Sequence, residues 1–268
     1  MTTIETTKPG ARVTGGSSPR RLLALGRAEL TLLLRNKSAL FLALFTPVLL
    51  TVGMRQMVGQ MELDGTGLTT GTVLLPMSVG FVLLFAVYAT LVGTYVVRRE
   101  ELVLKRLRTG EPTDGEILAA AALPSAVIAL LQCAVLLGGG GAVLSLASPS
   151  QPLLVLLGLV LGMAMMTAMA AASAVVTRTP EAAQLTVMPL IMVSMLGSGI
   201  VVPLEVLPDT LATFASYLPL SPVTELVRGG WVGGMTGGDV LKATGVALVW
   251  TALAGLAVRR WFRWEPRR

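Results

Sequence analysis

The sequence predicts an all-α membrane protein with six transmembrane helices, and three observations carry this prediction. The chain of 268 residues is 53% hydrophobic and 13% charged, whereas about a quarter of the residues in a soluble domain are charged. Uncharged apolar runs recur that are long enough to cross about 30 Å of hydrocarbon as helices. Lys and Arg gather beside the ends of these runs, as they do in cytoplasmic loops of membrane proteins.

The chain opens with two segments that precede the first apolar run. Residues 1–19 are polar and rich in Thr, Gly and Ser, so we expect a disordered cytoplasmic tail. In residues 20–37 several leucines share one helical face, while Arg27, Thr31 and Arg35 lie opposite. Such an amphipathic helix lies in the headgroup layer. It either anchors the chain to membrane lipid or also offers its outer face to a partner protein.

Six apolar runs follow. The expected spans are residues 38–54, 73–97, 117–146, 153–177, 182–203 and 243–258. Pro47 and Pro189 lie inside two of them, which a membrane bundle tolerates because neighbouring groups satisfy the freed backbone atoms. The third run is long enough to tilt, or to break at its four consecutive glycines, residues 138–141.

The distribution of Lys and Arg predicts the orientation of these spans. With six spans, both termini share one side, and of the 21 Lys and Arg residues only Arg55, Arg228 and Lys242 would lie on the other. The positive-inside rule therefore places both termini in the cytoplasm and the chain in the inner or plasma membrane. Basic residues at span ends are explained by this orientation and give no reason to expect a nucleic-acid partner.

The composition argues against several function classes. The chain has no His and one cysteine, Cys133, so it lacks the commonest general base and the usual zinc ligand sets. It has no Gly-Lys dipeptide, hence no phosphate-binding loop of the P-loop type. The five spans after the first contain no Asp, Glu, Lys or Arg, whereas ion-coupled carriers generally need one in the membrane. A membrane enzyme or a stand-alone carrier is therefore the less favoured interpretation.

The charged connection after the second span predicts a short amphipathic helix. Glu101 and Lys105 stand four residues apart in the favourable order for a helical ion pair. Gly110 and Pro112 would end this helix, and Thr113 with Glu116 three residues later predicts a capping box for the third span. The helix could dock into a groove on another protein, or the connection could simply be a solvated loop that fixes topology.

Three sequence blocks resemble the ABC-2 type permeases, and most closely those of the daunorubicin-exporter kind. The blocks are Arg27-Ala28-Glu29-Leu30 through Phe45-Thr46-Pro47, then Arg99-Glu100 with Leu104-Lys105-Arg106-Leu107-Arg108, and then Leu207-Pro208 with Leu218-Pro219-Leu220-Ser221-Pro222 and Arg228. Their order and spacing match over nearly the whole chain, so residues 20–268 are interpreted as one ABC-2 type transmembrane domain. Leu102-Val103 stands where the family usually has Gly-Thr, which predicts continuous helix in place of a turn.

The resemblance implies partners and functional residues. A separate ABC ATPase subunit would bind ATP, so this chain needs no cofactor of its own, and a second permease copy or paralogue would complete the complex. The residues implied in coupling to the ATPase are Arg99, Glu100, Glu101, Leu104, Lys105, Arg106 and Leu107, with Arg27, Glu29 and Arg35 of the interfacial helix nearby. Two short helices before the last span would form an outer gate carrying Glu225 and Arg228, unless those charges are simply satisfied within a packed loop.

These expectations describe an exporter of a hydrophobic or amphipathic small molecule, such as a drug or antibiotic, as in multidrug efflux. A permease for a lipid-linked glycan or for sodium has the same architecture and stays open. So does the purpose of the small-residue row begun by Gly158 and Gly162, which allows close helix contact within the chain or between copies. Methionines crowd the fourth and fifth spans and either line a path or fill the core.

Overall fold

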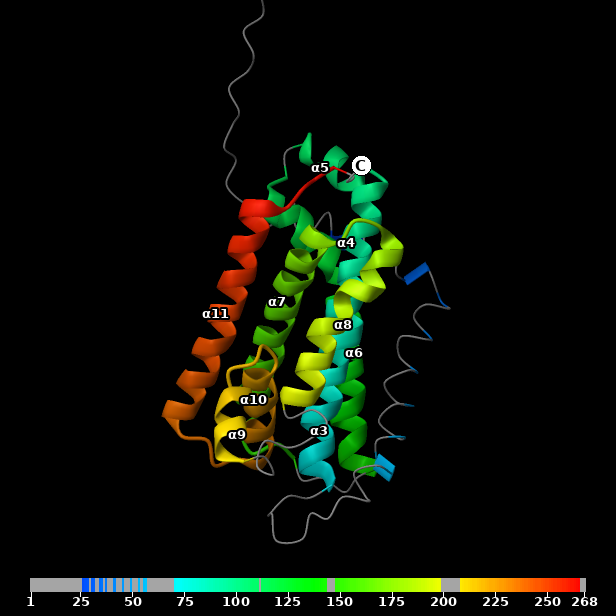
Figure 1. The fold of residues 1–268 in the computed structure, drawn as a ribbon. Coiled ribbons are helices and arrows are strands. Elements are labelled where there is room, and N and C mark those ends of the chain that lie inside the picture. Colours follow the sequence, from blue (N-terminus) through cyan, green and yellow to red (C-terminus); the bar gives the residue numbers. More distant parts are fainter. Residues whose placement is uncertain are drawn as a thin grey trace, which may run out of the picture.

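The computed structural model describes residues 70–110, 112–143, 148–198 and 208–265, with isolated positions between 26 and 56 (Figure 1). Every regular element in this part of the chain is a helix, as the composition predicts. The expected tail, residues 1–19, lies outside the described residues. So does most of the first expected span, of which isolated positions such as Phe41 and Phe45 are helical.

From residue 70 onward the described residues form ten helical elements. In order they are α3 (Thr70–Phe81), the π-helical η1 (Val82–Ala89), α4 (Thr90–Glu100), α5 (Val103–Arg108), α6 (Asp114–Val143), α7 (Pro152–Val176), α8 (Pro180–Gly197), α9 (Asp209–Ala215), α10 (Ser221–Val232) and α11 (Gly237–Trp261). The third expected span does not break at its glycines, since α6 runs through them. The last span begins six residues earlier than expected, because Thr236 and Asp239 form a capping box.

Four of the expected spans are present as helices long and apolar enough to cross a membrane. They cover Thr70–Glu100, Asp114–Gly138, Pro152–Val176 and Gly237–Trp261. The fifth expected span is present as α8, which has 18 residues, carries Glu181 in its first turn and is not among the four. The described residues therefore support four spans, and the count of six stays a prediction.

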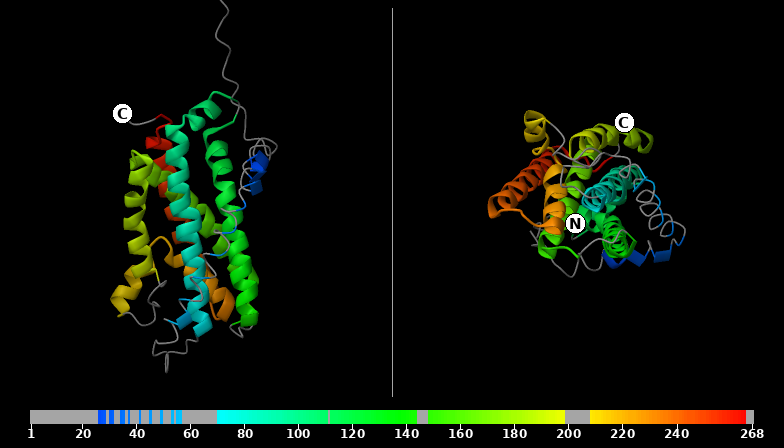
Figure 2. Two further views of the ribbon diagram at one scale, coloured as in Figure 1. Left: turned by 90° about the vertical axis from the view of Figure 1, so that its right-hand side faces the viewer. Right: turned by 90° about the horizontal axis from the view of Figure 1, so that it is seen from below.

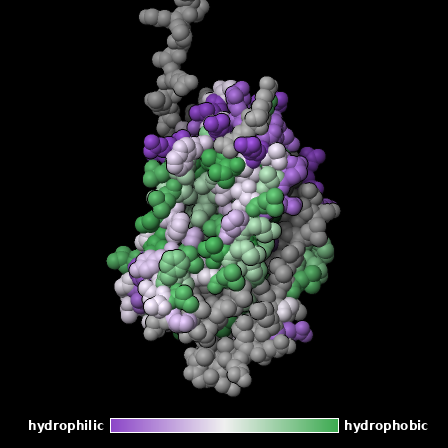
Figure 3. All heavy atoms as spheres, in the orientation of Figure 1, coloured by the Kyte–Doolittle hydropathy of each residue, from purple (hydrophilic) through white to green (hydrophobic). Residues whose placement is uncertain are grey.

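The long helices run alternately up and down and separate two ends of different character. One end, which we call the basic end, holds α5 together with the last turns of α4, α7 and α11, while α9 and α10 lie at the opposite end (Figure 1). Hydrophilic side chains gather at the basic end, above a broad apolar belt (Figure 3). This arrangement agrees with the split of Lys and Arg in the sequence, and the side of the membrane that each end faces stays a prediction.

The second expected span is the centre of the packing. Its helices α3, η1 and α4 follow one another between α6 and α8 (Figure 2, left), and 72% of its most apolar stretch is buried, against 17% for α11. Burial of apolar side chains on all sides, from Leu74 through Leu83 to Leu91, indicates a central helix. The long exposed face of α11 leaves apolar residues such as Leu241 and Leu256 for lipid or for another chain.

The small-residue row on α7 serves contact within the chain. A Cβ atom added at Gly162 would lie 2.7 Å from Leu83 Cδ1 and 2.9 Å from Val223 Cγ1, and one at Gly158 would lie 3.1 Å from Leu226 Cβ. These glycines therefore allow α10 to pack directly on α7. Met165 and Met166 of the same helix are fully buried and belong to the core.

Candidate functional site

The turn between α4 and α5 shapes the charged connection. Leu102 adopts the left-handed conformation, with φ 59° and ψ 13°, and among the described residues it is the one non-glycine residue with positive φ. The prediction of continuous helix through residues 102 and 103 is therefore wrong. The chain keeps the turn that glycine normally makes, although this conformation costs a residue with a Cβ atom about 1–2 kcal/mol.

The reversal at Leu102 places α5 back against the start of α6. Leu104 is fully buried and forms a small apolar cluster with Ile117 of α6 and with Trp264. The side chains of Lys105 and Arg106 are exposed. The burial of Leu104 compensates the strain of the turn. It also determines that the charged face of α5 points away from the helix bundle.

Arg99 is the least exposed charged residue described, with no accessible surface. Its guanidinium donates hydrogen bonds to the carbonyl oxygens of Ala174 (2.8 Å), Thr177 (2.6 Å) and Arg178 (3.2 Å). These oxygens lie at the C-terminus of α7, where a positive charge is favourable. Arg99 therefore ties α4 to the α7–α8 connection and does not form part of the surface.

The other residues expected in coupling divide into two groups. Glu101, Lys105 and Arg106 are exposed, whereas Glu100 and Leu107 are half-buried. The expected ion pair of Glu101 with Lys105 is not formed, because Leu102 interrupts the helix and Lys105 Nζ instead lies 2.7 Å from Glu265 Oε1. Sequence reasoning missed this partner, which follows the last span.

The start of α6 confirms the predicted capping box. The backbone N–H of Thr113 donates to Glu116 Oε2 at 2.7 Å, and the backbone N–H of Glu116 donates to Thr113 Oγ1 at 3.3 Å. Beside it, Arg108 Nε lies 3.0 Å from Asp114 Oδ1. These contacts join both ends of the short connection to α6.

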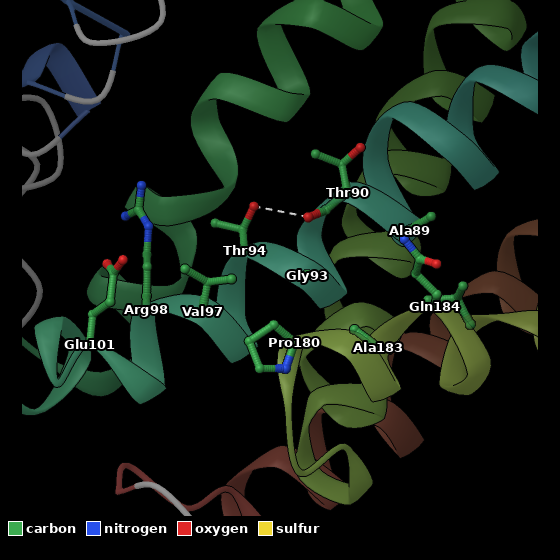
Figure 4. Close-up of a pocket in the computed structure, with 11 residues that line it drawn as sticks. Ala89, Thr90, Gly93, Thr94, Val97, Arg98, Glu101, Pro180, Ala183 and Gln184 are labelled. Atoms are coloured by element: carbon green, nitrogen blue, oxygen red, sulfur yellow. Dashed lines mark hydrogen bonds between the residues drawn. The ribbon is translucent and has the colours of Figure 1, made fainter.

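A groove runs between α4 and α8, with Arg98 and Glu101 at one end and Ala89 and Gln184 at the other (Figure 4). Its volume is about 520 Å³. The lining residues are Ala89, Thr90, Gly93, Thr94, Val97, Arg98 and Glu101 on the α4 side and Pro180, Ala183, Gln184 and Val187 on α8. The groove thus changes from small apolar and hydroxyl side chains to charged ones along its length.

The threonines of this groove also stabilise an irregular helix. Thr94 Oγ1 donates to the carbonyl of Thr90 at 2.9 Å, and Thr90 Oγ1 donates to the carbonyl of Phe85 at 2.8 Å, five residues back. Phe85 belongs to the π-helical η1, an element that often occurs at functional sites. The groove was not predicted from the sequence, although Thr90, Thr94 and Arg98 repeat at helical spacing along its polar side.

The opposite end contains the two short helices that the resemblance implies, α9 and α10. The backbone N–H of Gln151 donates to the carbonyl of Gly230 at 2.8 Å, and Thr224 Oγ1 donates to the carbonyl of Ser198 at 2.9 Å. The two hydrogen bonds join α10 to the start of α7 and to the end of α8. This helix is therefore held on two sides.

Both residues expected at the outer gate are half-buried in one cavity of about 470 Å³. Glu225 and Arg228 line it together with Thr72, Asp239 and Lys242. The structure thus brings the two expected residues together with two further charges that the sequence did not single out. The role of Glu225 and Arg228 in an outer gate stays a prediction.

The interfacial helix is described in part. Arg27 and Arg35 are helical and exposed, whereas Glu29 lies outside the described residues. Thr31 Oγ1 donates to the carbonyl of Arg27 at 2.7 Å, and Leu34 is 65% exposed. An exposed leucine beside exposed arginines is what a helix in the headgroup layer requires.

The architecture is that of a helical membrane protein, with a charged helix at one end and short capping helices at the other. The sequence profile of the family described as ABC-2 type transporter matches residues 20–231. The chain therefore belongs to the ABC-2 type transporter family, whose members are transporter membrane subunits that normally work with an ABC ATPase subunit. No curated protein matches the chain. The matched region ends in α10, so α11 and the residues after it lie beyond it.

Proposed function

We propose that this chain is the permease subunit of an ATP-driven exporter in the cell membrane, with its basic end in the cytoplasm. The observation that carries the proposal is the position of α5 at the basic end (Figure 1), where Lys105 and Arg106 are exposed. A separate ABC ATPase subunit would dock there and supply the energy. ATP itself would be bound by that subunit.

The contacts of α5 support a route from docking to transport. Force on α5 would reach α6 through the contact between Leu104 and Ile117. It would reach α4 through the turn at Leu102, and the α7–α8 connection through the hydrogen bonds of Arg99. Since α4 and α8 form the two walls of the groove, a shift of either wall would change its width.

The groove supports an amphipathic or hydrophobic small molecule, such as a drug or antibiotic, as the substrate. It offers apolar surface from Val97 and Val187 and charge from Arg98 and Glu101 at one end. Next to it α8 exposes apolar side chains, namely Leu185, Met188, Met192 and Leu196. We propose that a second permease copy or a paralogue covers this face, so that the path lies between two chains.

The test is transport by the permease reconstituted with its ABC ATPase subunit in liposomes. Daunorubicin, a lipid-linked glycan and sodium serve as the three probes, and ATP-dependent movement of daunorubicin is the expected result. Movement of the glycan or of sodium alone would assign the chain to those branches of the family, and no ATP-dependent movement of any probe would contradict the proposal.

The variants Lys105→Glu and Glu100→Ala test the role of the basic end. We expect each to reduce transport at least about tenfold while leaving expression intact, because docking surfaces lose several kcal/mol when a central charge is reversed or removed. Arg260→Glu is the matched control, since Arg260 is an exposed basic residue at the same end but on α11. Equal transport by Lys105→Glu, Glu100→Ala and the wild type would count against the docking role.

A further inference from the structure

The residues that follow α11 pack against α5, the helix proposed to couple the permease to the ATPase. Phe262–Glu265, which we call the C-terminal segment, packs across α5 and the start of α6. Trp264 lies within this segment and is 9% exposed, in contact with Leu104 and Ile117. The segment lies beyond the part of the chain that matches the family profile.

A helix as short as α5 depends on such cover. It has six residues, whereas isolated helices shorter than about 12 residues are marginal in water. The buried residue of α5 is Leu104, and its cluster contains Ile117 and Trp264, with Leu107, Leu118 and Phe262 packed against them. The indole ring is the largest side chain of this cluster, and aromatic side chains bury about 150–250 Å² each.

The C-terminal segment also makes contacts with charged side chains of α5. Glu265 Oε1 lies 2.7 Å from Lys105 Nζ, and the guanidinium carbon of Arg108 lies 5.0 Å from the centre of the Trp264 ring. Leu104 and Arg108 are one helical turn apart, and Trp264 shares a cluster with the first and lies under the guanidinium of the second. The exposed ion pair contributes little on its own, and the tryptophan is therefore the main contact.

Anchoring in the membrane interface does not explain the position of Trp264. Trp261, three residues earlier, is 61% exposed, as an interfacial anchor requires, whereas Trp264 is covered by the protein. Phe262 packs edge-on against it, with 5.0 Å between the ring centres. The two tryptophans thus have different environments although the sequence presents them alike.

We propose that the C-terminal segment is a positioning element of the ATPase-coupling site, with Trp264 as the residue that sets the orientation of α5. This inference rests on the proposed function for the role of α5. It adds that α11 is connected to the coupling helix directly, through the chain that follows it. Docking of the ATPase would then move α11 together with α5 and α6.

The first test uses the full-length permease in nanodiscs without any ATPase. Hydrogen exchange of the α5 amides is measured for Trp264→Ala, Trp264→Phe and the matched control Trp261→Ala. We expect exchange at least about tenfold faster in Trp264→Ala, equivalent to about 1.4 kcal/mol. Exchange within about twofold of wild type is expected in the other two variants. Unchanged exchange in Trp264→Ala would overturn the positioning role, and Trp264→Leu replaces this variant if it does not yield folded protein.

The second test adds the ABC ATPase subunit to the same nanodiscs. The concentration that gives half-maximal binding should rise about tenfold for Trp264→Ala and stay unchanged for Trp261→Ala, with rescue by Trp264→Phe. Faster exchange of α5 with unchanged ATPase binding would overturn the coupling part of the inference. Failure of the wild type to bind any ABC ATPase would instead overturn the proposed function, and the inference with it, while the exchange data would still report the packing.

Discussion

The two ends of the molecule are built in opposite ways. At the opposite end, which we call the outer end because the proposed orientation places it outside the cell, α10 has 12 residues, most of them buried, and backbone hydrogen bonds join it to the start of α7. At the basic end, α5 has six residues and one buried side chain, Leu104, and it begins at the strained Leu102. Local opening is easiest where few apolar contacts hold an element, so the outer end is suited to remain closed and the basic end to respond to a partner.

The largest loss of stability is expected from a substitution in α10, at the outer end. A Cβ atom at Gly230 would lie 2.8 Å from the backbone nitrogen of Val155 and 3.0 Å from the carbonyl oxygen of Gln151, and neither backbone atom can move aside cheaply. We expect Gly230→Val to lower the free energy of unfolding by about 3 kcal/mol. The thermal midpoint of the purified permease measures this. Gly245→Val is the control, because its position on α11 is open, and equal midpoints would contradict close packing of α10 on α7.

The next effect is expected at Arg99, where the basic end is tied to the core. Arg99→Met leaves the carbonyl groups of Ala174 and Thr177 without their donors, and hydrogen bonds to charged groups contribute about 1.5–3 kcal/mol. We expect a loss of about 2 kcal/mol in stability together with loss of ATP-driven transport. Arg98→Met serves as the control for stability alone, since Arg98 is half-buried and lines the proposed substrate groove. An equal loss of stability in Arg99→Met and Arg98→Met would contradict the anchoring role of Arg99.

A substitution at Leu102 is expected to stabilise α5 at the basic end. Leu102→Gly removes the cost of a left-handed residue with a Cβ atom, about 1 kcal/mol, and restores the residue that the family usually has there. Leu107→Gly, at an ordinary helical position of α5, should instead destabilise this helix by about 1 kcal/mol. Protection of the α5 amides from hydrogen exchange should rise in the first variant and fall in the second. A fall in both would show that the turn is not strained.

The smallest effect concerns pH. The hydrogen bond and charge of Lys105 lower the pKa of Glu265 below its usual value. A carboxyl whose pKa is lower in the folded state stabilises it at neutral pH, and this contribution is lost as the pH falls through the lowered pKa. Exchange of the α5 amides in wild type and in Glu265→Gln should therefore differ slightly at pH 7 and converge in acid. A difference that grows in acid would contradict the pairing.

What the sequence could predict is what local chemistry determines. Helix positions follow from apolar length, and the cap formed by Thr113 and Glu116 follows from side chains three residues apart. The two ends follow from the placement of Lys and Arg. The family resemblance added the short helices α9 and α10, whose boundaries composition alone does not show.

The features that sequence reasoning missed depend on contacts between distant segments. Leu102 was expected to continue a helix because a leucine favours one, yet packing of Leu104 against Ile117 overrides that preference. Arg99 was expected to serve at the coupling surface, and it is buried because it caps α7, about 75 residues later in the chain. Trp264 is buried whereas Trp261 is exposed, and sequence alone does not distinguish these two tryptophans near the end of the last span.

The most direct test of the account is a crosslink from α5 to the ABC ATPase in living cells. A photoreactive phenylalanine analogue replaces Arg106, which is exposed on α5, or Phe214, which is 70% exposed on α9 at the outer end. We predict a crosslinked permease–ATPase product from position 106 and none from position 214. A product from position 214, or none from position 106 while the two subunits still copurify, would contradict docking at the basic end.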